Sequence, residues 1–113
     1  MLFRSHLGGI LPLVADHLVR AAEVDPALKR KVPEGIKSAL RAFHYDTALR
    51  AHPGALAAAL QLLDVRRILF GTDAPLRRSA EQLQGLLEHG FSEQDLRGIE
   101  FENARRLLNP AVK

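Results

Sequence analysis

A short apolar run in the second half of the chain limits the possible folds more than any other feature. Residues 67–71 are dominated by Ile, Leu and Phe and end at a glycine, a pattern typical of a short buried strand. Residues 1–5 and 44–48 predict two further strands. Longer segments with helical spacing separate them. Because strands that alternate with helices favour right-handed β-α-β units and a parallel sheet, the sequence predicts an α/β fold.

The predicted helices begin and end at prolines, glycines and capping residues. A first helix is predicted over about 11–23, and the Asp25-Pro26 pair is expected to end it. The basic residues 29–31 are expected in a surface connection, after which Pro33 opens a second helix. Three more helices are predicted. The first covers 54–63, and the second begins at Ser79 as its cap and ends at Gly90. The third begins with a capping box at 92–95 and ends at Asn109-Pro110.

Composition is ordinary for one globular domain and excludes several classes of site. The 113 residues contain no cysteine, which excludes disulfides, thiolate-bound zinc and a cysteine nucleophile. The net charge of +3 comes from scattered basic pairs without interleaved aromatics, so we expect no nucleic-acid partner. No apolar stretch is long enough to span a membrane and no signal-cleavage pattern is present, so we expect a cytoplasmic protein. No repeat or linker divides residues 1–113, which we interpret as one unit.

Three polar side chains follow the predicted strands at the ends where parallel α/β folds bind ligands. His6 follows the first strand, Asp46 lies within or just after the second, and Asp73 follows the third. Asp73 is the stronger candidate, because a carboxylate beyond a buried strand must be solvated, hydrogen-bonded or metal-bound. The structural alternatives are a helix cap or turn at Asp73 before Pro75, and a backbone hydrogen bond at His6. We expect His6 and Asp73 to converge at one rim.

The other histidines and the common catalytic motifs add no second site. Structural roles are expected for His17, His44, His52 and His89. The chain has no G-x-S-x-G, phosphate-binding loop, G-x-G-x-x-G or H-E-x-x-H. Serine-hydrolase, nucleotide-binding and zinc-protease sites of these types are therefore not expected.

Four segments resemble the amidohydrolase-related proteins in their order and spacing. They are His6-Leu7-Gly8-Gly9, Tyr45-Asp46-Thr47-Ala48, Ile68-Leu69-Phe70-Gly71-Thr72-Asp73-Ala74-Pro75 and Asn103-Ala104-Arg105-Arg106-Leu107-Leu108. The chain looks most like the branch that contains aminocarboxymuconate-semialdehyde decarboxylase and related aromatic-acid decarboxylases. Together the segments span nearly the whole chain.

The resemblance implies a metal-dependent enzyme on a TIM (β/α)8 barrel. In such proteins an H-x-H on the first strand and a histidine on a middle strand bind a divalent metal, usually zinc. The resemblance implies that Asp73 is a metal ligand and that His6 is the catalytic acid/base that orients or deprotonates metal-bound water. It assigns no direct chemistry to Asp46. This assignment of the metal to Asp73 and of proton transfer to His6 is chemically reasonable, because Zn²⁺ lowers the pKa of bound water toward ~7, where imidazole also titrates.

The chain departs from this family in length and in metal ligands. A complete barrel has about 250 residues and eight strands. This chain has 113 residues, and it contains neither an H-x-H nor a histidine left for the middle-strand position. We therefore expect the C-terminal part of such an enzyme, a partial TIM (β/α)8 barrel that starts near the sixth strand, with about three parallel strands and flanking helices.

The expected parent chemistry is metal-assisted decarboxylation or hydrolysis of a small carboxylated substrate. The isolated chain is expected to be inactive, because a catalytic zinc normally needs three protein ligands. Three strands leave open sheet edges, so the expected partner is the missing N-terminal half of the barrel or a second copy of the chain. The alternative function is a non-catalytic interaction or oligomerisation module derived from the same family.

Overall fold

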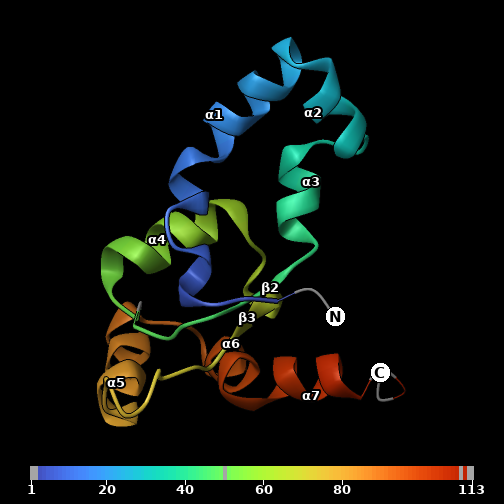
Figure 1. Ribbon diagram of the computed structural model, residues 1–113. Coiled ribbons are helices and arrows are strands. Elements are labelled where there is room, and N and C mark those ends of the chain that lie inside the picture. The colour runs from blue at the N-terminus through green and yellow to red at the C-terminus, as the bar shows by residue number, and fades with distance from the viewer. Residues whose placement is uncertain (1–2, 50, 110, 112–113) are drawn as a thin grey trace.

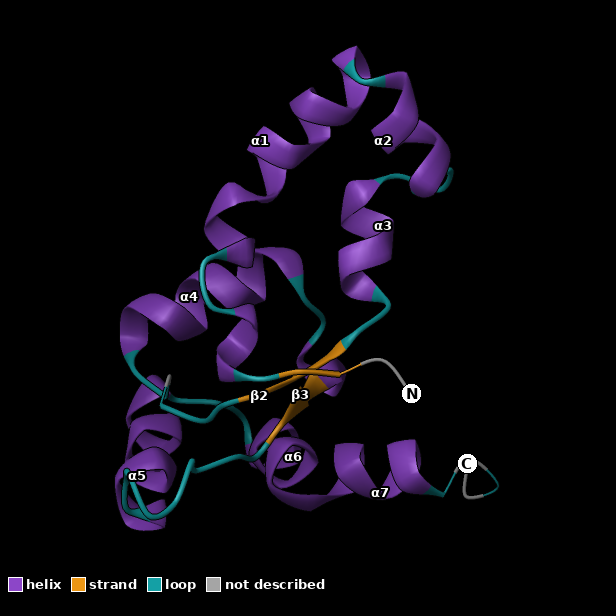
Figure 2. Ribbon diagram, in the orientation of Figure 1, coloured by secondary structure: helices purple, strands orange, loops and turns teal. Residues whose placement is uncertain are grey.

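Three short parallel strands form the centre of the fold. The computed structural model describes residues 3–49, 51–109 and 111. Strands β1 (Phe3–Arg4), β2 (His44–Asp46) and β3 (Ile68–Leu69) lie in the order β1-β2-β3, and each neighbouring pair is parallel (Figure 1). Helices connect the strands and flank them (Figure 2). The predicted α/β class with three parallel strands is therefore confirmed.

Helices make up most of the described chain. The arm that rises away from the sheet between β1 and β2 consists of α1 (Leu11–Val24), α2 (Pro26–Lys31) and α3 (Ile36–Arg41) (Figure 1). Helix α4 (Pro53–Leu62) joins β2 to β3. The helices after β3 are α5 (Ser79–His89), α6 (Glu93–Arg97) and α7 (Asn103–Leu108). Shorter turns are the 3₁₀ turns η1 (His6–Gly8) and η2 (Val65–Arg67) and the π-helical turn η3 (Gly98–Glu102). None of the helices in the described ranges is long and apolar enough to cross a membrane.

The central strand carries the core. Tyr45 in the middle of β2 is fully buried, and its hydroxyl donates to the Leu40 carbonyl at 2.7 Å. The same buried cluster contains Leu7 from η1, Leu56 from α4 and Ile68 from β3. Burial of each of these apolar side chains contributes about 1.5–3 kcal/mol relative to exposure. The core thereby fixes the turn after β1 against the sheet and α4.

The π-helical turn η3 attaches the C-terminal helices to the last strand. Its backbone hydrogen bonds close rings that are one residue longer than those of an α-helix. The Ile99 carbonyl in this turn accepts from the Phe70 N–H, directly after β3, at 2.9 Å. The buried side-chain amide of Asn103 donates to the carbonyls of Val65 at 3.0 Å and Ile68 at 2.7 Å. Two sets of contacts therefore hold the C-terminal helices against β3.

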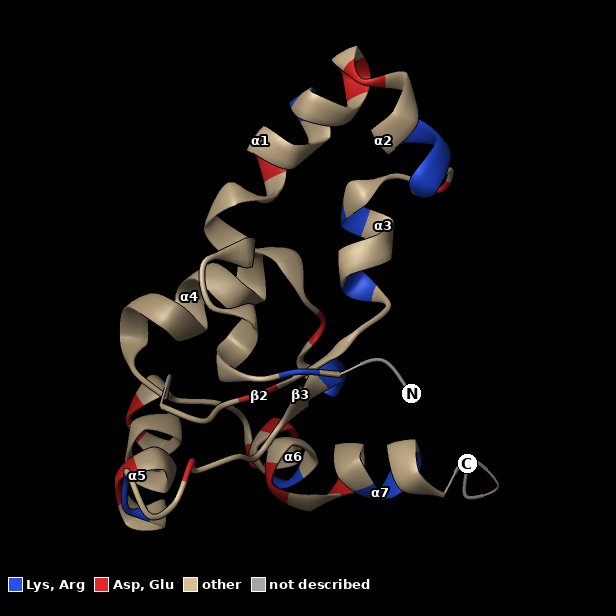
Figure 3. Ribbon diagram, in the orientation of Figure 1, with Lys and Arg blue, Asp and Glu red and all other residues tan. Residues whose placement is uncertain are grey.

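The basic segment 29–31 lies in an exposed connection between α1 and α3, as expected, but this connection contains a short helix that was not predicted from the sequence. The Asp25-Pro26 pair ends α1 as expected, but it also begins α2. The Asp25 carboxylate accepts from the N–H groups of Ala27 and Leu28, and Pro26 is the first helical residue. The last turn of α2 carries the basic residues 29–31, far from the sheet (Figure 3).

Two predicted helix starts are shifted. Helix α3 begins at Ile36 and not at Pro33, because Gly35 has a φ of 92°, outside the helical region. Helix α5 is preceded by Arg78 in an extended conformation, so Ser79 is its first helical residue and not its cap. The predicted ends and caps of the next elements are confirmed: Gly90 is left-handed with a φ of 81°, and the Ser92 hydroxyl caps α6.

The strands are shorter than their sequence patterns predict. Strand β3 covers Ile68–Leu69 of the predicted 67–71, because Arg67 belongs to η2 and Phe70 pairs with a helix. Strand β2 covers His44–Asp46 of the predicted 44–48, and β1 covers Phe3–Arg4 of the predicted 1–5. The first two residues of that prediction lie outside the described residues, as does Pro110 at the end of the last predicted helix.

Candidate functional site

His6 and Asp73 converge at the carboxyl end of the sheet. His6 follows β1 in η1, and Asp73 follows β3. Their side chains meet with His6 Nε2 at 3.6 Å from Asp73 Oδ2, and they are 36% and 33% exposed. The expected convergence of these two side chains is therefore observed. An imidazole beside a partly exposed carboxylate can exchange protons and attract a cation.

The turn that presents His6 has an unusual backbone. His6 and Leu7 have positive φ angles of 58° and 51°, followed by 77° at Gly8 and 62° at Gly9. Such angles are costly for residues with a Cβ atom and persist where the surroundings enforce them. Leu7 is buried in the core, and a Cβ atom on Gly8 would lie 2.8 Å from Tyr45 Cε1. Packing against Tyr45 thus holds the turn, and with it the imidazole.

Asp73 also has a positive φ, of 60°. Its carbonyl accepts from the Leu76 N–H at 2.9 Å, so the residue lies in a tight turn before α5. It is not the cap of that helix, which is preceded by Arg78. The Asp73 backbone therefore has the turn role considered from the sequence, while its carboxylate is left to face His6.

Asp46 supports His6. Its Oδ1 accepts from the backbone N–H of His6 at 2.9 Å and of Ala48 at 3.0 Å. The Ser5 hydroxyl lies 3.1 Å and 2.9 Å from the two carboxylate oxygens. The same hydroxyl lies 2.7 Å from His6 Nδ1. A chain of contacts therefore runs from Asp46 through Ser5 and His6 to Asp73.

Thr47 and Gly71 bring the segment after β3 against β2. The buried Thr47 hydroxyl accepts from the Gly71 N–H at 3.1 Å and donates to the Gly71 carbonyl at 3.0 Å. A Cβ atom on Gly71 would lie 2.9 Å from Asp46 Cβ and Cγ, so the close approach requires glycine. These contacts position the backbone that leads to Asp73.

Ser5 and Thr47 are site residues that sequence reasoning did not single out. Thr47 lies in the segment that resembles the amidohydrolases, but its role depends on Gly71, which is 24 residues away. Ser5 ends the first predicted strand, so the rule that selected His6, a polar side chain at a strand end, also applies to it.

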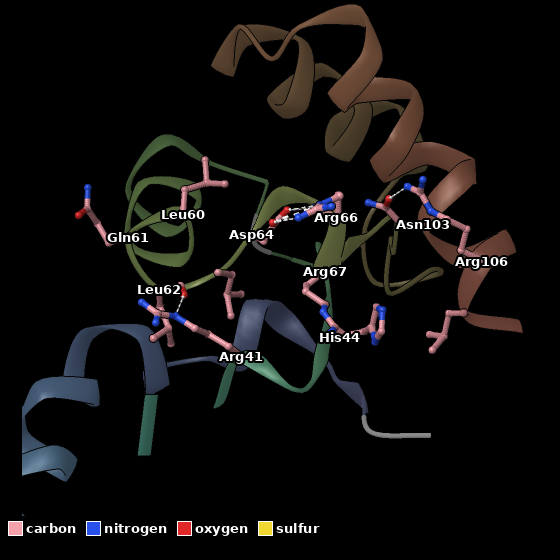
Figure 4. A pocket seen from close by; sticks show the side chains of 12 residues that line it. Arg41, His44, Leu60, Gln61, Leu62, Asp64, Arg66, Arg67, Asn103 and Arg106 are labelled. Carbon is pink, nitrogen blue, oxygen red and sulfur yellow. Dashed lines mark hydrogen bonds and ion pairs between the residues drawn. The ribbon is translucent and has the colours of Figure 1, made fainter. Parts of the chain in front are cut away.

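A large cavity lies at the opposite, amino end of the strands. It has a volume of about 830 Å³, and Figure 4 shows its polar lining, which includes Arg41, His44, Arg66, Arg67, Asn103 and Arg106. None of the predicted site residues lines it. Burial, and then the positive charge of Arg67, lower the pKa of His44 below its ordinary value. The cavity is therefore distinct from the rim that carries His6 and Asp73.

The remaining histidines have separate environments. His52 Nδ1 accepts from the Ala55 N–H at 3.4 Å at the start of α4. The His89 ring lies 4.4 Å from the Phe91 ring, measured between centroids, and His17 is exposed on α1. Among residues 3–49, 51–109 and 111, no three His, Cys, Asp or Glu side chains form a group able to hold a metal ion. His6 and Asp73 are only two side chains, fewer than the three protein ligands that a catalytic zinc normally has.

Several proteins similar to this chain are decarboxylases. The chain is 35% identical over 74 residues to 6-methylsalicylic acid decarboxylase of Penicillium expansum, a match that covers 63% of this chain and 22% of that protein. Dihydroxybenzoic acid decarboxylase from Polaromonas sp. JS666, solved with manganese and 2-nitroresorcinol, aligns with a TM-score of 0.77 and 22% identity over 98% of this chain and 34% of its own. For 2,6-dihydroxybenzoate decarboxylase from Rhizobium, the TM-score is 0.74, the identity 24% and the coverage 96% of this chain and 34% of that chain.

The structural alignments show the fold. The chain spans about a third of each of these two solved structures and 22% of the Penicillium protein. Three parallel strands with flanking helices match part of the decarboxylase barrel, so the predicted partial TIM barrel is confirmed. Residues 2–109 match the sequence profile of the amidohydrolases, and the chain therefore belongs to the amidohydrolase family.

Proposed function

We propose that this chain supplies part of the active-site rim of a metal-dependent decarboxylase, with His6 as the general acid/base and Asp73 as a metal ligand. The approach of His6 Nε2 to 3.6 Å from Asp73 Oδ2, beyond two parallel strands, carries the proposal. Residues 1–113 act as one structural unit in this proposal.

The proposed substrate is a small aromatic carboxylic acid. Loss of carbon dioxide requires delivery of a proton to the carbon atom that carried the carboxyl group. An imidazole suits this task, because it gains and loses a proton near neutral pH. The decarboxylases among the similar proteins favour this reaction over hydrolysis, the other reaction expected from the sequence.

The proposed cofactor is a divalent metal ion. Asp73 would be one of its ligands, and the other ligands must come from residues beyond the described part of this chain. A bound divalent ion supplies Lewis-acid stabilisation of negative charge on a substrate oxygen. Zinc is our proposal for the metal; manganese, present in the Polaromonas structure, is the competing ion.

The chain alone is proposed to be inactive. Among the described residues, β1 and β3 are the outer strands of the sheet, and each pairs with only one other strand. Phe3 on β1 is 43% exposed although it is a large apolar side chain. A polypeptide that continues the sheet, or a second copy, would cover these surfaces and is the proposed partner.

Complementation with a relative tests the proposed function. The chain is co-expressed with the part of the Penicillium decarboxylase that it does not match, and carbon dioxide release from 6-methylsalicylic acid is measured with zinc or manganese. We expect no turnover by either piece alone and turnover by the complex. His6→Asn should reduce that turnover by about 100-fold or more, since general acid/base catalysis alone contributes this much. Asp73→Asn should also reduce it, because it removes the charge of the proposed metal ligand.

Exposed residues on the arm provide matched controls. His17→Asn and Glu34→Gln make the same chemical changes away from the rim and should leave turnover unchanged. Stoichiometric tight zinc with turnover by the chain alone would show that the proposed inactivity is wrong. Full activity of the His6→Asn complex would exclude His6 as the acid/base.

An interaction or oligomerisation module is the second candidate, and exposed apolar side chains favour it. Ile10, Leu13, Leu76 and Leu108 are 66%, 73%, 74% and 72% exposed. Mass measurement during size exclusion separates the two functions. A stable dimer that shows neither metal binding nor complementation would support the module.

A further inference from the structure

We infer that Ser5 and Asp46 are positioning residues that hold the His6 ring in one tautomer, with the proton on Nδ1 and the lone pair on Nε2. The mechanistic meaning of this inference rests on the proposed function, in which Nε2 exchanges a proton with the substrate. The tautomer itself follows from hydrogen bonds within the chain, and it is measurable without metal or substrate.

The Asp46 carboxylate sets the direction of these hydrogen bonds. Carboxylate oxygens only accept. Oδ1 accepts from the backbone N–H groups of His6 and Ala48, at 2.9 Å and 3.0 Å. The Ser5 hydroxyl is 2.9 Å from Oδ2 and 3.1 Å from Oδ1. Ser5 has a single hydroxyl proton, and this geometry assigns it to Asp46.

The tautomer of His6 follows from that assignment. Ser5 Oγ is 2.7 Å from His6 Nδ1, a short hydrogen-bond distance. Because the hydroxyl proton points to Asp46, the oxygen presents a lone pair to the ring. An unprotonated Nδ1 would place a second lone pair against it. Nδ1 is therefore the donor.

The opposite ring nitrogen is left as the acceptor. A neutral imidazole carries one N–H, so a proton on Nδ1 leaves the lone pair on Nε2. This nitrogen is 3.6 Å from Asp73 Oδ2, beyond hydrogen-bond distance. The lone pair is therefore available at the rim to accept a proton. Asp46 controls the ring through Ser5 and also binds the His6 backbone, so it fixes both orientation and tautomer.

His52 provides an internal reference with the opposite tautomer. Its Nδ1 accepts from the Ala55 N–H at 3.4 Å, so the proton of its neutral ring lies on Nε2. The same spectrum of the chain can therefore report both tautomers.

Nitrogen NMR of the metal-free, ¹⁵N-histidine-labelled chain, at a pH where the imidazoles are neutral, tests the inference. We expect a protonated-type Nδ1 and an unprotonated-type Nε2 for His6, and the reverse for His52. In Ser5→Ala the ratio of the Nδ1–H to the Nε2–H form of His6 should fall about tenfold, as expected for loss of one good hydrogen bond. Ser5→Thr keeps the hydroxyl and should restore the ratio.

Asp46→Asn separates control of the tautomer from a merely structural role. The Asn carbonyl oxygen can keep the two backbone bonds of Oδ1, while the amide nitrogen takes the place of Oδ2 and donates to Ser5. The Ser5 proton then turns to His6 Nδ1, and the ring should change to the Nε2–H form. A carboxylate that served only to hold the backbone would produce no such change.

The result that overturns the inference is an Nε2–H ring at His6 in the unsubstituted chain. An unchanged His6 tautomer in folded Ser5→Ala and Asp46→Asn, each with a native-like amide spectrum, overturns it as well. If Asp46→Asn does not fold, the Ser5→Ala and Ser5→Thr pair decides. Absence of metal binding or complementation contradicts only the proposed function, because the tautomer is measured without either.

Discussion

The two ends of the sheet hold their polar side chains in different ways. At the carboxyl end, groups from all three strands meet: Asp46 at the end of β2 binds Ser5 and the His6 backbone beside β1, and the His6 ring reaches Asp73 beyond β3. These three contacts join residues that lie at the ends of different strands or follow them. A fourth joins the neighbouring residues Ser5 and His6. The result is one partly exposed imidazole with a defined position.

At the amino end, a cavity of about 830 Å³ is lined by four arginines, and three of them are bound to other residues of the same lining. Arg66 pairs with Asp64 at 2.6 Å, Arg41 donates to the Leu62 carbonyl at 2.8 Å and Arg106 donates to the Asn103 side chain at 2.7 Å. These polar groups of the cavity therefore bind one another, whereas the carboxyl end leaves the His6 ring partly exposed beside Asp73.

Asn103→Ala should destabilise the chain most and leave the His6 ring unchanged. The substitution leaves the partly buried carbonyl of Val65 and the buried carbonyl of Ile68 without their amide donor, which costs about 3 kcal/mol. Urea unfolding measures the loss, and Asn109→Ala at an exposed position is the matched control. A change in the His6 nitrogen spectrum of folded Asn103→Ala would show that the two ends are not independent.

Gly71→Ala should have an intermediate effect and act on the carboxyl end. The added Cβ atom would lie 2.9 Å from Asp46 Cβ and Cγ, so either Asp46 or the segment after β3 must move. We expect a loss of about 1–3 kcal/mol in the free energy of unfolding, together with a change in the His6 spectrum. Gly54→Ala, whose Cβ would have ordinary contacts of 3.7 Å with His52, is the control. An unchanged His6 spectrum in Gly71→Ala would contradict the role of this close approach.

Arg66→Gln should have the smallest effect, and that effect should depend on pH. The hydrogen bonds from the Arg66 side chain and backbone lower the pKa of Asp64 from 3.8 to about 2. Because the pKa is lower in the folded state, the stabilisation is present above pH 3.8 and is lost as the pH falls toward 2. The two side chains are 74% and 46% exposed, so solvent screening keeps the gain small.

Urea midpoints at pH 7 and pH 2 measure this dependence. The midpoints of the unsubstituted chain and Arg66→Gln should differ slightly at pH 7 and coincide at pH 2. Arg30→Gln on α2 removes an exposed arginine outside the cavity and should show no such pH dependence. A difference that grows toward pH 2 would contradict the direction of the Asp64 shift.

Periodicity predicted the parallel sheet, and the sheet brought His6 and Asp73 together. Both follow strands, and the carboxyl ends of parallel strands share one edge, so their convergence required no knowledge of side-chain contacts. The strand-end position of Ser5 could mark it as a candidate, but its role could not be predicted in this way. Its hydroxyl acts between Asp46, 41 residues away, and the neighbouring His6, and that link exists only once β1 lies beside β2.

Helix α2 and the length of β3 were not predicted correctly, and the sequence contains evidence for only the first. Asp25-Pro26 is a good helix start as well as a helix end, so α2 was readable from the capping preference of Asp and the position of Pro. The length of β3 was not readable, because the N–H of Phe70 pairs with Ile99 in a helix and this partner is set by the tertiary structure.

The π-helical turn η3 imposes a length requirement on the C-terminal helix. Deletion of one residue between 98 and 102 would rotate everything after it by about 100° and return the segment to α-helical spacing. The Ile99 carbonyl would then leave the Phe70 N–H, and the Asn103 amide would turn away from the end of β3. The number of residues in η3 thus determines how the last strand is held, and an insertion or deletion there would alter the sheet as well as the helix.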